Sequence, residues 1–198
     1  IFTVMSALAN EHQAVNLGQG FPDFGCDPKL LDAVNQAMLA GHNQYPPMTG
    51  WPALREVIAS KIEALHARHY DAATEITITA GATQAILTAI LATVHQGDEV
   101  IVLDPCYDSY EPAIELNGGV AVHVPLDGED FSVDWQRVRG AVTPRTRMIL
   151  VNTPHNPGGA VFSASDLDEL AALTRDTGIF VLSDEVYEHI VFDGAVHQ

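Results

Sequence analysis

Basic residues are scarce in this chain. Its 198 residues contain 9 Lys and Arg against 26 Asp and Glu, a formal net charge of −17, and the only lysines are Lys29 and Lys61. Proteins that bind nucleic acids use clustered cations to displace counterions from the phosphates. The composition therefore argues against a nucleic-acid partner and against an anionic membrane surface.

Long apolar runs and paired cysteines are also missing. The most apolar stretch, residues 85–94, is shorter than the roughly 20 residues that cross a bilayer, and no Lys or Arg opens a signal peptide. Cys26 and Cys106 lie far apart, so they form neither a disulfide framework nor a metal-binding pair. We therefore expect a cytoplasmic protein without a metal, in which both thiols are reduced.

Several common functional motifs are absent as well. The run Gly18-Gln19-Gly20 does not continue into the glycine pattern of dinucleotide-binding proteins, and there is neither a Walker A loop nor a G-x-S-x-G elbow. Hydrophobic residues nevertheless make up 47% of the chain and charged residues only 18%, a balance typical of a globular core.

Strand and helix patterns alternate along most of the chain. Apolar and β-branched runs predict strands at 75–79, 99–104, 120–124, 147–151 and 179–182, and helices are predicted at 28–40, 51–69, 81–95, 110–116, 135–142 and from Ser163 or Ser165 onward. Strands this apolar must be covered on both faces. The predicted fold is a doubly wound, mostly parallel α/β sheet with helices on both faces. Residues 1–27 are expected to be a loop-like N-terminal arm, and residues 28–198 to belong to the large domain.

Four segments at or just after predicted strands carry polar or aromatic residues, where ligands bind in such sheets. At residues 80–84, Ala-Gly-Ala-Thr-Gln, free N–H groups and the Thr83 hydroxyl suit a phosphate. Tyr107 can stack on a planar ring. The loop 152–159, NTPHNPGG, presents the Asn156 amide, and Asp184 ends an apolar strand, where a charge needs a cation or a protonated ring.

Each segment alone also fits an ordinary turn, a packed ring or a solvated acid. Together they describe a site for a phosphorylated, planar and protonatable heterocycle, and pyridoxal 5′-phosphate (PLP) has all of these groups. In the loop 152–159 we further predict at least one cis X-Pro bond, at Pro154 or Pro157, because a sharp turn must aim Asn156 over the sheet.

The same segments resemble a known family. VNLGQGFPDF, NQYPPMTG, TAGATQA, DPCYDSYEPAI, NTPHNPGG and SDEVYEHI are similar to the large domain of fold-type-I PLP-dependent aminotransferases of class I/II, and most similar to the methionine and kynurenine (glutamine-phenylpyruvate-like) group. The resemblance covers about residues 16–192. It implies a homodimer with shared active sites that moves an amino group from a methionine or aromatic amino acid to a 2-oxo acid.

The resemblance also implies roles for single residues. Asp184, Asn156 and Tyr187 would be the catalytic residues: Asp184 pairs with the ring nitrogen and keeps it protonated, and the other two hydrogen-bond the ring O3′. By the same resemblance, Gly81, Ala82 and Thr83 would bind the cofactor phosphate, as would Tyr45 of the neighbouring subunit. Tyr107 would stack on the pyridine ring, and Gly20 and Asn156 would bind the substrate.

One part of the family pattern is missing. The family's catalytic lysine lies downstream of the SDEVYE segment, and neither Lys29 nor Lys61 fits it, so the chain resembles an N-terminal portion without the lysine-bearing half. Three other functions stay open at this point. They are β-elimination by a cysteine-S-conjugate lyase, a non-catalytic PLP-binding regulatory module, and a flavodoxin-like or nucleotide-binding domain.

Overall fold

The chain folds into two compact units. The computed structural model describes residues 1–20, 22, 24–128 and 130–198, divided into Ile1–Met48 and Thr49–Gln198. The smaller unit contains helices α1 (Phe2–Glu11) and α2 (Pro28–Leu39). The predicted division after residue 27 stays a prediction, and residues 21 and 23 of the predicted arm lie outside the described residues.

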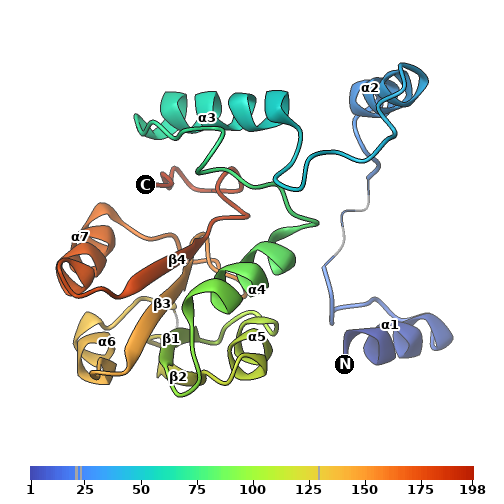
Figure 1. Cartoon of the computed structure of the whole chain (residues 1–198). Coiled ribbons are helices and arrows are strands. Elements are labelled where there is room, and N and C mark those ends of the chain that lie inside the picture. The colour runs from blue at the N-terminus through green and yellow to red at the C-terminus, as the bar shows by residue number, and fades with distance from the viewer. Residues whose placement is uncertain (21, 23, 129) are drawn as a thin grey trace. The chain divides into compact units, whose positions relative to one another are not determined.

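The larger unit alternates helices and strands (Figure 1). Its elements are α3 (Pro52–His66), α4 (Ala82–Thr93), β1 (Glu99–Asp104), α5 (Tyr110–Leu116), β2 (Val120–Pro125), α6 (Trp135–Ala141), β3 (Thr146–Asn152), α7 (Ala164–Thr174) and β4 (Phe180–Asp184). From residue 81 onward, every predicted helix and strand is present within a few residues of its expected bounds.

The described residues form a parallel four-stranded sheet in the order β2-β1-β3-β4. Parallel neighbours need a crossover connection, and the intervening helices provide it. The pairing of β3 with β4 brings Asn152 level with Asp184 at the carboxyl ends of these strands. The register therefore places two polar side chains side by side at the carboxyl edge of the sheet.

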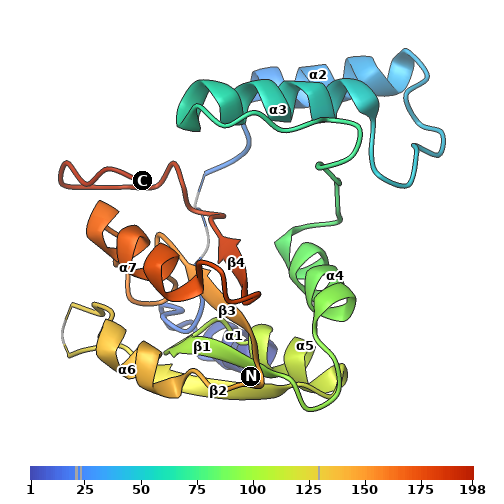
Figure 2. The same ribbon diagram turned by 60° about the vertical axis from the view of Figure 1, so that its left-hand side comes forward.

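The two faces of the sheet carry separate cores. On β1, Val100 and Val102 pack with α4 and α5, whereas Ile101 and Leu103 pack with α6 and α7. Figure 2 shows these two helix pairs on opposite sides of the sheet. Because successive strand residues point to opposite faces, a strand covered on both sides must be apolar throughout. The predicted α/β fold with helices on both faces is confirmed.

Local sequence signals explain where two of the helices begin. The Asp134 carboxylate accepts from the first-turn N–H groups of α6, and α7 starts with a capping box between Ser163 and Asp166. Side-chain oxygens satisfy the N–H groups that lack intrahelical acceptors. By contrast, Gly81 begins α4 without a side-chain cap.

Two predictions about local structure are wrong. Residues 75–79 do not form a strand: the Ile78 N–H bonds the Thr49 carbonyl at 3.0 Å, and among the described residues no strand pairs with this segment. An alternating pattern of apolar residues does not produce a strand when no neighbouring strand is there to pair with it. Residues 2–11 are helical rather than loop-like, because the glycines and proline that suggested a loop all lie in residues 18–25.

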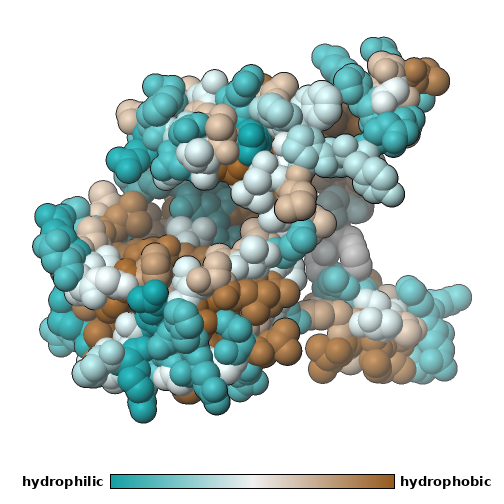
Figure 3. Space-filling view, in the orientation of Figure 1, coloured by the Kyte–Doolittle hydropathy of each residue, from teal (hydrophilic) through white to brown (hydrophobic). Residues whose placement is uncertain are grey.

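Apolar side chains remain exposed on part of the surface (Figure 3). On the edge strand β4, Phe180 and Val181 are each 42% exposed, and α2 buries none of its residues. Within the part of the chain that the structure describes, no helix combines the length and the apolar character needed to cross a membrane.

Candidate functional site

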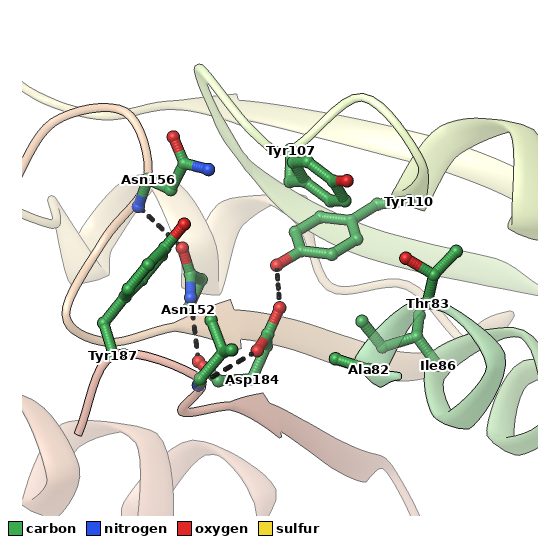
Figure 4. Close-up of a pocket in the computed structure, with 10 residues that line it drawn as sticks. Ala82, Thr83, Ile86, Tyr107, Tyr110, Asn152, Asn156, Asp184 and Tyr187 are labelled. Carbon is green, nitrogen blue, oxygen red and sulfur yellow. Dashed lines mark hydrogen bonds between the residues drawn. The ribbon is translucent and has the colours of Figure 1, made fainter. Parts of the chain in front are cut away.

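A pocket of about 150 Å³ lies in the larger unit, at the carboxyl ends of β3 and β4 and the N-terminus of α4. Figure 4 shows the side chains that converge on it. The lining residues come from four segments distant in sequence: Ala82, Thr83, Ile86, Tyr107, Tyr110, Asn152, Asn156, Asp184, Val186 and Tyr187.

The start of α4 offers hydrogen-bond donors to this pocket. Gly81 precedes the helix with φ of +85°, which favours glycine, and it supplies no side-chain cap to the first turn. The first N–H groups of a helix have no intrahelical acceptor and carry partial positive charge. The Thr83 hydroxyl points into the same space (Figure 4). This end of the pocket therefore suits an anion.

Asp184 supplies a buried negative charge to the same pocket. It is the last residue of β4 and only 9% exposed. Its Oδ2 accepts a hydrogen bond of 2.6 Å from the Tyr110 hydroxyl, and its Oδ1 accepts one of 3.3 Å from the Val186 N–H. Among the described residues no Lys, Arg or His forms an ion pair with it. A buried carboxylate without a cationic partner suits a ligand that brings positive charge.

Two tyrosines form one wall: Tyr110 at the start of α5 and Tyr107 in the segment before it. Tyr110 is 2% exposed, and the ring of Tyr107 meets it edge to face at 5.7 Å and 71°. Burial, followed by the hydrogen bond to Asp184, raises the pKa of the Tyr110 phenol far above its usual value. Tyr110 is therefore a hydrogen-bond donor across the physiological pH range. Tyr107 remains 38% exposed, so part of its ring is free to contact a ligand.

The loop 152–159 is tied to Asp184 through Asn152. The side-chain amide of Asn152 donates to the Asp184 carbonyl at 2.8 Å, and its Oδ1 accepts from the Asn156 N–H at 2.7 Å. These bonds leave the Asn156 side chain directed at the pocket, near Tyr187 (Figure 4). The Pro154 and Pro157 peptide bonds are both cis, which confirms the prediction of at least one.

His155, between Asn156 and Pro154, is part of the support for this loop rather than of the pocket lining. It is 7% exposed, and its Nδ1 accepts a 3.1 Å hydrogen bond from the Gly158 N–H. Burial lowers the pKa of His155. A neutral imidazole is consistent with an Nδ1 that acts as acceptor.

The structure brings most of the predicted site residues together. Ala82, Thr83, Tyr107, Asn156, Asp184 and Tyr187 line one pocket, and Gly81 begins the helix that borders it. Gly20 and Tyr45 belong to the unit of residues 1–48, where both are exposed. Their predicted roles remain predictions, as do the roles of the lining residues.

Sequence reasoning missed four of the lining residues: Ile86, Tyr110, Asn152 and Val186. Asn152 and Tyr110 stood inside the quoted motifs but had no assigned role, although each forms a short hydrogen bond to Asp184. Asn152 ends its strand as Asp184 does, which is a usable signal. For Tyr110 the sequence holds no such signal, because 74 residues separate it from its partner.

Neither lysine lines the pocket. Lys61 on α3 pairs with Glu188, and Lys29 lies on α2 in the smaller unit. The described residues also hold no group of three or more His, Cys, Asp or Glu placed to bind a metal ion. Both cysteines are free.

The donor set fits one kind of ligand. An anion-binding helix start, an aromatic wall and a buried acid without a cation all face one small cavity. A planar molecule that carries a phosphate at one end and a protonated ring nitrogen at the other satisfies all three. PLP is such a molecule, so the residues present fit the cofactor that the sequence resemblance implies.

Comparison with known proteins agrees with this geometry. The family profile described as "Aminotransferase class I and II" matches residues 12–198. The chain is 50% identical over 197 residues to a methionine aminotransferase of Escherichia coli, covering 100% of the chain and 51% of that protein. It is 48% identical to a probable N-succinyldiaminopimelate aminotransferase of Mycobacterium tuberculosis, covering 100% and 50%.

A human relative and a solved structure give the same picture. Kynurenine–oxoglutarate transaminase 1 of Homo sapiens is 38% identical, over 96% of this chain and 48% of its own length. A crystal structure of an Escherichia coli protein with methionine aminotransferase function superposes with a TM-score of 0.96 at 50% identity, over 100% of this chain and 52% of that one. The chain thus spans about half the length of the curated relatives it matches.

Proposed function

From the premise that the chain belongs to the class I and II aminotransferase family, we propose that it forms the PLP-binding part of an enzyme that moves an amino group from an amino acid to a 2-oxo acid. One observation carries the proposal more than any other. Asp184 is a buried acid without an ion-pair partner among the described residues, and it lines the same small pocket as an uncapped helix start.

The chain's residues would hold PLP at both ends. The first-turn N–H groups of α4 and the Thr83 hydroxyl bind the phosphate, and Tyr107 stacks on the ring. Asp184 holds the proton on the ring nitrogen, since a carboxylate in a dry site favours the charged form of a neighbouring base. When bound, the cofactor supplies an electron sink that acidifies the Cα–H bond of the amino acid.

Asn156 and Tyr187 would hydrogen-bond the ring oxygen O3′ of the cofactor. Both reach the pocket, and the Asn156 side chain is left available because its backbone N–H, rather than its amide, bonds Asn152. An amide N–H and a phenol O–H donate to the ring oxygen O3′ and stabilise negative charge there. Asn156 and Tyr187 would thus hold the ring as hydrogen-bond donors, and Asp184 would hold it as an acceptor.

The remaining parts of the proposal extend beyond this unit. Gly20 and Asn156 contact the substrate carboxylate, and Tyr45 reaches the phosphate of a second subunit in a homodimer. The amino donor is methionine or an aromatic or kynurenine-type amino acid, and the protein is cytoplasmic. The lysine that bonds the cofactor comes from outside the 198 residues, because neither Lys29 nor Lys61 lines the pocket.

The test uses the protein expressed from its complete reading frame. We expect PLP-dependent conversion of methionine or kynurenine to its 2-oxo acid only when a 2-oxo acid acceptor is added. Formation of 2-oxo acid from a cysteine S-conjugate at the same rate without an acceptor would instead assign β-elimination. Absence of saturable PLP binding, followed by absorbance, would refute the proposed cofactor site.

A further inference from the structure

Tyr110 is a pocket residue for which the proposed function has no role. It is the first residue of α5, and its ring is packed in the core beside Ile86 and Ile114. The residue also lines the pocket, where its hydroxyl points to Asp184 (Figure 4). A phenylalanine would fill the same core volume, so packing alone gives no reason for a hydroxyl at this position.

The Tyr110 hydroxyl has Asp184 as its hydrogen-bond partner. It donates to Oδ2 at 2.6 Å, which is shorter than the 3.3 Å bond that the Val186 N–H makes to Oδ1. Hydrogen bonds from a neutral donor to a carboxylate are among the stronger ones in proteins. In Figure 4 the ring lies between Tyr107 and Asp184, with its hydroxyl aimed at the acid.

Tyr110 also restrains the stacking ring. Tyr107 meets it edge to face at 5.7 Å, so one buried ring contacts both the aromatic wall and the acid. The position of Tyr110 is itself set by the core, because it is 2% exposed among aliphatic side chains. The acid is therefore held by a group that cannot move without disturbing the core.

We propose that Tyr110 is a positioning residue: its hydroxyl holds the Asp184 carboxylate in one orientation, so that the acid retains the proton on the cofactor's ring nitrogen. The inference rests on the proposed function. The physical reason is that donation to a carboxylate favours the pair of charged acid and protonated ring over the neutral pair. Without the hydroxyl, the ring nitrogen would hold its proton less strongly, and the Asp184 carboxylate could rotate.

The experiment measures dissociation constants of the protein expressed from its complete reading frame for PLP and for an analogue in which a C–H group replaces the ring nitrogen. The variants are Tyr110→Phe, Asp184→Asn, the double variant, and Tyr70→Phe as a matched control outside the pocket. We expect Tyr110→Phe to weaken PLP binding about tenfold, the size of one hydrogen bond to a charged group. Binding of the analogue should change less than about twofold, since it has no ring proton to retain.

Two further readouts separate positioning from packing. In the Asp184→Asn background, Tyr110→Phe should have no added effect on PLP binding, because non-additivity marks residues that act through one another. The PLP affinity of Tyr110→Phe should also fall with rising pH more steeply than that of the unchanged chain. Tyr70→Phe should alter none of these values.

Other outcomes overturn the inference. Equal losses for PLP and the analogue, or additive losses in the double variant, would make Tyr110 a packing residue. Unchanged PLP binding by Tyr110→Phe would do the same. If Tyr110→Phe does not fold, the double variant is compared with Asp184→Asn instead, because the double variant leaves no unpaired charge. A difference in PLP affinity between these two variants contradicts the inference. If the unchanged chain binds neither PLP nor the analogue, the proposed function fails first, and the inference falls with it.

Discussion

Replacing Asp184 with alanine tests the centre of the proposed site. The change removes the acceptor of the 2.6 Å bond from Tyr110 and of the 3.3 Å bond from Val186. Leaving the buried Tyr110 hydroxyl without a partner costs about 1–3 kcal/mol. Removing a carboxylate that is 9% exposed and without an ion-pair partner among the described residues offsets part of that cost. We therefore expect the fold to persist with a small change in the free energy of unfolding.

The effect on PLP should be much larger than the effect on stability. Losing a charge-assisted hydrogen bond of about 1.5–3 kcal/mol weakens binding by roughly 10- to 150-fold. In the protein expressed from its complete reading frame, Asp184→Ala should also abolish transamination, because the ring nitrogen is no longer kept protonated. Urea unfolding and an absorbance titration with PLP measure the two effects separately.

Asp168→Ala is the matched control, since this acid is exposed on α7 and does not line the pocket. It should change neither PLP affinity nor activity. Asp184→Asn should recover stability relative to alanine, because the amide oxygen still accepts from Tyr110, yet PLP binding should stay weak. Affinity of Asp184→Ala within twofold of the unchanged chain, together with normal turnover, would refute the assignment of Asp184 to the ring nitrogen.

Two further predictions concern the loop 152–159 and the edge of the sheet. In Gly158→Ala the new Cβ would lie 2.5 Å from Phe131 Cγ and 2.7 Å from His155 Nδ1, so we expect a loss of about 1–3 kcal/mol in the free energy of unfolding. In Gly159→Ala the new Cβ would have no heavy atom within 4 Å, and the only strain would come from a φ of +76°, so the loss in the free energy of unfolding should be about 1 kcal/mol. Equal urea midpoints for the two variants would contradict this reasoning. The hydrogen bond to Asp104, at 2.9 Å, raises the pKa of His123 against a smaller opposing effect of burial. Because the folded pKa lies above the unfolded value near 6.5, this pair stabilises the fold fully below about pH 6.5 and loses its effect as the pH rises through the folded pKa. His123→Gln should show a flatter dependence of the urea midpoint on pH over that range, and identical pH profiles would show that the pair contributes nothing.

Much of the fold was predictable because its signals are local. The strand at Glu99–Asp104 and the helix at Tyr110–Leu116 occur at the predicted residues, since each is a short apolar or amphipathic run bounded by glycine or proline. The segment 75–79 has an equally clear pattern but is not a strand. Whether an alternating segment pairs depends on a neighbouring strand, which its own residues do not encode.

The sequence by itself determined the chemistry of the site. A glycine before a helix, an acid at the end of an apolar strand and a proline-bounded Asn156 were recognisable because ligand sites in α/β sheets follow the strands. Asn156 and Asp184 meet at one pocket because the parallel strands β3 and β4 end at the same edge of the sheet. The glycine follows no strand in the structure, and it reaches the pocket because α4 packs on a face of the sheet.

Only the tertiary structure decided which side chains hold those groups in place. Tyr110 and Asp184 are 74 residues apart and meet because α5 packs with α4 on one face of the sheet, so that the first residue of α5 reaches the carboxyl end of β4. Asn152 bonds the Asp184 carbonyl because β3 and β4 pair in a register that sets them level. Such contacts depend on packing and register across the whole sheet, and a one-residue shift in pairing would separate them.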